Sequence, residues 1–246
     1  MVRIIIALVI AMSAPANAQN RNQALITAAG KGDLLAVERL IRDGASVAAR
    51  DGSGRSALLA ATHGNHVAVA RALIAAGADV NAQDAIKDSP FLYAGAEGRD
   101  EILKMTLAAG ADLKSTNRYG GTALIPAAHH GHPETVRILL GTAIDKDHVN
   151  NLGWTALLEA VILGDGGPVH TEIVRLLVEA GANPKDVQAM MRHSRVGTTL
   201  DIYAQFVPDS QRRAIEQTSK MAAERIANAQ AAKNANARES STMVVN

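Results

Sequence analysis

The chain has 246 residues, enough for one or two domains. It carries 25 Lys and Arg against 24 Asp and Glu, so its charge gives no reason to expect a nucleic acid or an anionic membrane as partner. Cysteine is absent, which excludes disulfides, thiolate metal sites and a cysteine nucleophile. Because 48% of the residues are apolar but only 2% are aromatic, the predicted core is aliphatic.

The first 18 residues have the pattern of a secretory signal peptide. Arg3 provides a positive charge, an apolar run follows from Ile4 to Met12, and Ala16-Asn17-Ala18 places small residues before a cleavage point at Gln19. A membrane anchor is the alternative, but this run is far shorter than the roughly 20 residues that a spanning helix needs. We therefore expect residues 1–18 to be removed, a periplasmic or secreted mature protein, and no membrane span after cleavage.

A period of 33 residues organises the chain from about residue 21 to residue 184. A polar-apolar triplet, an alanine, an apolar pair and a closing Gly-Ala step recur at this spacing. The recurring alanines are Ala28, Ala61, Ala94, Ala127 and Ala160. Five extra residues lie in the last unit, around Gly164 to His170, and are interpreted as a flexible insertion between two helices.

Each unit is interpreted as two short helices and a loop. The Ser or Thr that opens a triplet is typical of a helix N-cap. A Gly or Asn then ends the first helix, because the backbone needs a positive φ there. These predicted breaks are Gly32, Asn65, Gly98, Gly131 and Gly164. The fourth unit has Ala143-Ile144 in place of Gly-Ala, so its closing turn is expected to be rebuilt or loose.

These residues resemble the ankyrin repeat. The family pattern T-P-L-H-x-A-A is similar to the segments 89–95 and 122–128, and its G-A-D-V-N-A ending is literal at 77–82. The resemblance implies an all-α solenoid of five helix-turn-helix units over residues 19–184, followed by short C-terminal helices. It implies a protein partner, no small-molecule substrate, no metal or other cofactor, and no enzymatic activity. The motif histidine is replaced by Ile26, Leu59, Leu92, Ile125 and Leu158.

Ankyrin domains generally bind proteins through their loop tips and the ends of their first helices. Carried onto this chain, the resemblance implies that the tips offer Arg55, Ile86, Asp88, Arg118, Tyr119, Leu152 and Trp154. It implies that the helix ends offer His63, Glu97, His129 and His130. Aromatic and Arg side chains are frequent affinity anchors, so Arg118, Tyr119 and Trp154 stand out. Packing of Trp154 against its own repeat is an equally good interpretation.

Three histidines, His129, His130 and His132, lie within four residues and raise the question of a zinc or copper site. Adjacent residues of a helix point about 100° apart, and no carboxylate is placed by the sequence to complete such a site. A structural role is therefore the favoured interpretation. His66 and His132 are expected at the start of second helices.

The repeat pattern stops after Pro184, and residues 185–217 resemble the end of a tyrosine recombinase of the phage integrase family. The resemblance rests on Arg192-His193-Ser194, Thr198-Thr199 and Tyr203. It implies that Tyr203 corresponds to the nucleophile and His193 to a histidine that holds the scissile phosphate. Phosphodiester transfer also needs several cations, which the ankyrin-like segment does not supply, so we expect no catalysis.

Two functions therefore remain open at this point. The favoured one is an exported, non-catalytic protein-interaction module of ankyrin type. The alternative is DNA binding or recombination by a remnant of a tyrosine recombinase. Residues 185–228 are expected to form an integrase-like helical fragment that caps the array, and residues 229–246 are expected to be disordered.

Overall fold

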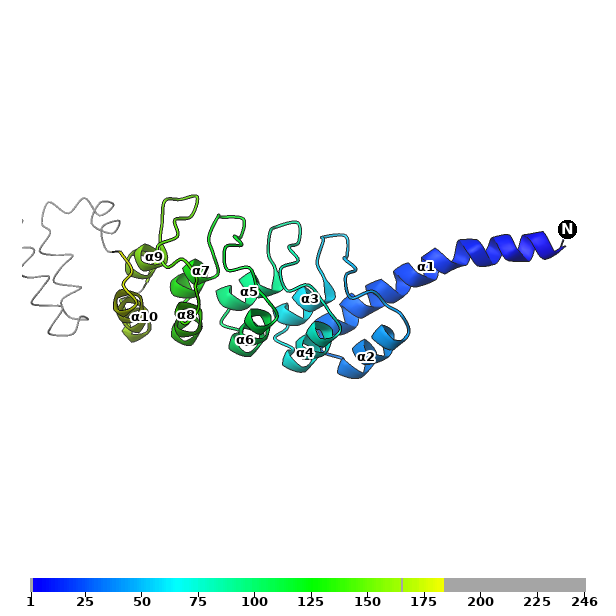
Figure 1. Cartoon of the computed structure of the whole chain (residues 1–246), viewed down its shortest axis with the longest axis horizontal. Coiled ribbons are helices and arrows are strands. Elements are labelled where there is room, and N and C mark those ends of the chain that lie inside the picture. The colour runs from blue at the N-terminus through cyan, green and yellow to red at the C-terminus, as the bar shows by residue number, and fades with distance from the viewer. Residues whose placement is uncertain (1, 165, 184–246) are drawn as a thin grey trace, which may run out of the picture. The chain divides into compact units, whose positions relative to one another are not determined.

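The computed structural model describes residues 2–164 and 166–183, with side chains from Asn17 onward. Within these residues the chain forms helices and no strand (Figure 1). The helices succeed one another in pairs, which confirms the predicted all-α array of helix-turn-helix units. The pairs are α1 (Val2–Lys31) with α2 (Leu34–Arg42), α3 (Ala57–His63) with α4 (Val67–Ala75), α5 (Pro90–Ala96) with α6 (Asp100–Ala108), α7 (Leu124–His129) with α8 (Pro133–Leu140), and α9 (Ala156–Ile162) with α10 (Pro168–Glu179).

The units stack so that each helix packs on its counterpart in the next unit. The C-terminal part of α1 is followed by α3, α5, α7 and α9 in one row, and α2, α4, α6, α8 and α10 form a second row. The loops between units project beyond the first row (Figure 1). The third residue of each triplet is fully buried between the rows. These core residues are Leu25, Leu58, Phe91, Leu124 and Leu157.

Positive φ angles end the first helices of four units as predicted. Gly32, Asn65, Gly98 and Gly131 have φ values of 75°, 54°, 65° and 79°. The prediction for Gly164 is wrong, because the left-handed residue of the fifth unit is Gly166, with φ 68°. The extra residues of this unit shift the break, and α10 extends over 12 residues instead of the nine of α4.

The closing turn of the fourth unit is rebuilt, as expected. Gly44, Gly77, Gly110 and Gly181 close the other units with φ between 80° and 87°. Ala143 does not adopt a positive φ. Instead the Thr142 hydroxyl donates to the carbonyl of Leu139 at 2.6 Å and accepts from the Ile144 amide at 3.2 Å. A side chain thus supplies the turn that a glycine forms elsewhere.

The predicted N-caps form in three of the four units that carry a Ser or Thr. Ser56, Ser89 and Thr155 each accept a hydrogen bond from the amide three residues later. The prediction for Thr122 is wrong: α7 has Ala123 at its N-cap and no side-chain cap. Pro126 lacks the N–H that would donate to the Thr122 carbonyl, so the Ile125 amide makes that bond instead, at 3.3 Å.

The loop tips share one hydrogen-bonding arrangement at the 33-residue period. At each tip an Asp or Asn side chain accepts from the amides two and four residues later. These residues are Asp51, Asp84, Asn117 and Asn150. Arg50 and Gln83 also donate to carbonyls of the following unit, at 2.7 and 2.8 Å. Hydrogen bonds within a tip and hydrogen bonds to the following unit together fix the orientation of these tips.

The predicted cleavage point at Gln19 lies within α1, which continues through it without a break. No helix among the described residues is both long and apolar enough to cross a membrane. The predicted integrase-like fragment 185–228, with His193 and Tyr203, and the predicted tail 229–246 lie outside the described residues.

Candidate partner-binding site

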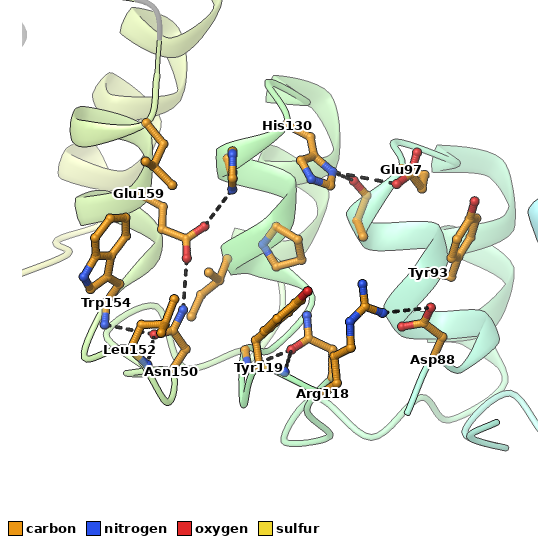
Figure 2. A pocket seen from close by; sticks show the side chains of 17 residues that line it. Asp88, Tyr93, Glu97, Arg118, Tyr119, His130, Asn150, Leu152, Trp154 and Glu159 are labelled. Atoms are coloured by element: carbon orange, nitrogen blue, oxygen red, sulfur yellow. Dashed lines mark hydrogen bonds and ion pairs between the residues drawn. The ribbon is translucent and has the colours of Figure 1, made fainter. Parts of the chain in front are cut away.

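A hollow of about 460 Å³ opens on the loop side of the third, fourth and fifth units (Figure 2). Its walls come from the tips that precede α5, α7 and α9 and from the exposed ends of these first helices. It therefore combines the two kinds of position that the ankyrin resemblance implied for partner binding. The predicted residues that line it are Asp88, Glu97, Arg118, Tyr119, His129, His130, Leu152 and Trp154.

Three predicted partner-binding residues lie outside the lining of this hollow. Arg55 is engaged at its own tip, where its guanidinium lies 3.0 Å from the Asp51 carboxylate. Ile86 is 51% exposed at the next tip. His63 ends α3, and its ring stacks against Tyr93 with the centroids 4.0 Å apart. His63 thus contacts Tyr93, a lining residue, without lining the hollow itself.

Arg118 lines one side of the hollow and contacts two neighbouring side chains. Its guanidinium lies 4.7 Å from the ring centroid of Tyr119 and 3.8 Å from Asp88. Burial and the nearby Asp84 raise the pKa of Asp88, while Arg118 lowers it. The cation is therefore held at one side of the hollow by a ring and a carboxylate from two different units (Figure 2).

Glu159 is a carboxylate buried at the floor of the hollow, only 6% exposed. One oxygen accepts from the Asn150 side-chain amide at 2.9 Å, and the other lies 3.2 Å from Nδ1 of His129. Burial raises the pKa of Glu159, and the contacts with His129 and Asn150 oppose that rise. Asn150 thus joins the tip to the helix, because its oxygen orders the tip while its amide holds Glu159.

The histidines of the described residues serve largely as links between units. His66, His130 and His170 each place a ring nitrogen within 3.1 Å of a carbonyl in the preceding unit. This agrees with the structural interpretation. The sequence placed no carboxylate to complete a metal site here, and the structure adds that Glu159 of the next unit lies 3.2 Å from Nδ1 of His129. No group of three or more metal-ligating side chains gathers in the described part of the chain.

Among the lining residues that sequence reasoning missed are two polar side chains of the first helices, Tyr93 and Glu159. Both follow the triplet at the same register, the position held by Ala60 and Pro126 in the neighbouring units. The available signal was a large polar side chain at a register that is apolar in the second and fourth units and holds the small Thr27 in the first. Whether a residue at this register is buried in the core or lies at the floor of the hollow depends on the distance between neighbouring units. The spacing of residues along the sequence does not give that distance.

The comparisons with known proteins address the fold directly. A family model described as ankyrin repeats (3 copies) matches residues 2–84 and 91–188. The chain belongs to the ankyrin-repeat family. Members of this family generally act as non-catalytic protein-interaction modules. A comparison with curated proteins finds no match.

Solved ankyrin structures extend this agreement to three dimensions. An ankyrin repeat domain from Acinetobacter baumannii AYE is 57% identical over 65% of this chain and 82% of its own, with a TM-score of 0.63. The ankyrin repeat protein EF0377 is 40% identical over 73% of this chain and 97% of its own, with a TM-score of 0.66. These matches show the ankyrin fold.

Proposed function

We propose that this ankyrin protein is an exported, non-catalytic module that binds a protein partner at the hollow between its third and fifth units. The observation that carries the proposal is the convergence of tip and helix-end residues from three units on one concavity. A partner segment placed there would bury Tyr119 and Leu152, which are 53% and 63% exposed. Aromatic side chains at the centre of a concave surface are frequent contributors to binding energy.

A site-specific photocrosslinking experiment tests this location in the native cell. The photoreactive residue p-benzoylphenylalanine replaces Tyr119 in one variant and Leu35 in another. Leu35 is the matched control because it is 78% exposed on α2 and lies outside the hollow. We expect a discrete crosslinked protein from position 119 and none from position 35. The same products from both positions, or no product from position 119, would contradict the proposed site.

Export is part of the proposal and rests on the sequence pattern of residues 1–18. Cleavage before Gln19 would leave the last part of α1 to serve as the first helix of the array. The N-terminus of the purified protein tests this, and so does its distribution between cytoplasm and envelope. We expect mature protein that begins at Gln19, and accumulation of the precursor when Ala18 is replaced by Arg. A full-length cytoplasmic product would contradict export.

A further inference from the structure

Aromatic side chains are concentrated in the hollow. Apart from the fully buried Phe91, every Phe, Tyr or Trp of the described residues lines it: Tyr93, Tyr119 and Trp154. The face of an aromatic ring attracts a cation, and the attraction grows when the cation loses water. Arg118 over Tyr119 is an instance of this interaction within the protein.

The floor of the hollow offers a carboxylate with unused acceptor capacity. A carboxylate has about four lone-pair positions, whereas Glu159 has one close partner at each oxygen. Burial of such a group is unfavourable unless a positive charge compensates it. The nearest candidate within the protein is His129, whose imidazole is positive only when protonated. An incoming cation would complete the compensation.

The fixed charges of the lining are predominantly negative. Asp88, Glu97 and Glu159 face a single guanidinium, that of Arg118, which is already held by Asp88. The closest basic group to Glu97 is the imidazole of His130, at 3.8 Å. The lining therefore favours a positive guest over a neutral or negative one.

We propose that the hollow receives an arginine or lysine side chain from the partner protein, with Glu159 as acceptor and Tyr119 and Trp154 as the surrounding aromatic surfaces. In the view of Figure 2 these two rings lie on either side of the Glu159–Asn150 pair. The inference rests on the proposed function and adds the chemistry of the partner: an exposed basic residue on an extended segment that reaches past the loop tips.

Trp154 is the only tryptophan of the chain, so its fluorescence reports occupation of the hollow. The probes are short Gly/Ser peptides with one central arginine, lysine or citrulline, the last being a neutral analogue of arginine. We expect a saturable change in fluorescence with arginine or lysine, and binding on the order of tenfold weaker with citrulline, because charge-assisted hydrogen bonds are the stronger ones. Equal binding of the citrulline peptide, or no saturable binding, would overturn the inference.

A pair of protein variants tests the role of the carboxylate. Glu159→Gln removes the charge from the floor, whereas Glu101→Gln removes one from α6, where the side chain is 63% exposed and paired with Lys104. We expect Glu159→Gln to weaken the arginine peptide about tenfold and Glu101→Gln to leave it unchanged. Equal effects of the two variants would overturn the inference. The citrulline comparison uses unaltered protein, so it remains decisive even if Glu159→Gln folds poorly.

The two proposals fail in different ways. The crosslink through position 119 can also be measured in protein that carries Glu159→Gln. If the partner crosslinks as efficiently as it does without that substitution, the proposed function stands and the inference of a basic residue is overturned. In the opposite case, peptide binding depends on both a positive charge and Glu159, but the protein gives no crosslink in the cell. This result supports the inference and contradicts the proposed function.

Discussion

Nδ1 of His129 lies 3.2 Å from the buried carboxylate of Glu159, although the two residues belong to successive units. The contact joins the end of α7 to α9 across the floor of the hollow. A ligand that displaces water from the hollow would meet both groups at once. The pair therefore couples the stability of the array to the chemistry of its candidate site.

Replacement of Glu159 by Gln is expected to stabilise the protein at neutral pH. Burial raises the pKa of Glu159, so the folded state holds the proton more tightly than the unfolded state. The resulting stability is present below the unfolded pKa and is lost as pH rises through the folded pKa. Glutamine keeps an acceptor for Asn150 without this dependence. Urea unfolding at several pH values should give the variant the same free energy of unfolding as wild type at low pH and a larger one at pH 7. A variant whose free energy of unfolding falls further below that of wild type as pH rises would contradict this.

Replacement of Asp51 by Asn is expected to reduce the sensitivity of the protein to acid. Burial raises the pKa of Asp51, but hydrogen bonds from Ser53 and Arg55 outweigh it and lower the pKa from 3.8 to about 2. The stability gained is present above the unfolded pKa and lost as pH falls from 3.8 through about 2. Because Asn117 forms the same tip, the Asp51→Asn substitution should cost no more than about 1 kcal/mol at pH 7. Unchanged acid sensitivity of thermal unfolding would contradict the assignment.

Replacement of Lys87 by Gly is expected to stabilise the protein. Lys87 has φ 64°, at the position that Gly54, Gly120 and Gly153 occupy in the other tips. The left-handed conformation costs a residue with a Cβ about 1–2 kcal/mol, and part of this is offset by the flexibility of glycine when unfolded. Chemical denaturation should show a gain of about 0.5–1 kcal/mol.

The reverse substitution, Gly153→Ala, is the control for this prediction. A Cβ at Gly153 would meet no atom within 4 Å, so only its φ of 80° opposes the change. We expect a loss of about 1 kcal/mol. Equal stability of both variants and wild type would show that the tip conformation carries no strain.

The two buried threonines at the starts of α7 and α9 should respond differently to valine. Thr155 caps α9 through the Leu158 amide, so Thr155→Val should cost about 1 kcal/mol. Thr122 is also 2% exposed, but its buried hydroxyl has no hydrogen-bond partner among the described residues. Thr122→Val should therefore be nearly neutral. Comparable losses in the two variants, measured by denaturant unfolding, would contradict the rearranged cap of α7.

The array itself could be predicted from the sequence because its pattern repeats. The period of 33 assigned three of the caps and most of the glycine turns, since each depends on bonds within one unit. The exceptions arise where one residue departs from the pattern. Pro126 removes an amide and with it the Thr122 cap, and the extra residues around Gly164 move the left-handed turn to Gly166.

The candidate site could be predicted only in part. The family resemblance pointed to tips and helix ends, and most of those residues line one hollow. The sequence did not place Glu159 beside His129, because that contact depends on the distance between successive helices and not on spacing along the chain. It also did not separate Arg55, which pairs with Asp51 within its own tip, from Arg118, which lies in the hollow.

The bonds that Arg50 and Gln83 make to the carbonyls of Gln83 and Thr116 both span 33 residues. Gln83 therefore receives from the preceding tip the same kind of bond that it makes to the following tip. A joint that repeats at the period of the units can be extended by a whole module without a new set of contacts. Lengthening by complete units is thus the route by which such a protein can acquire a broader recognition surface without redesigning its joints.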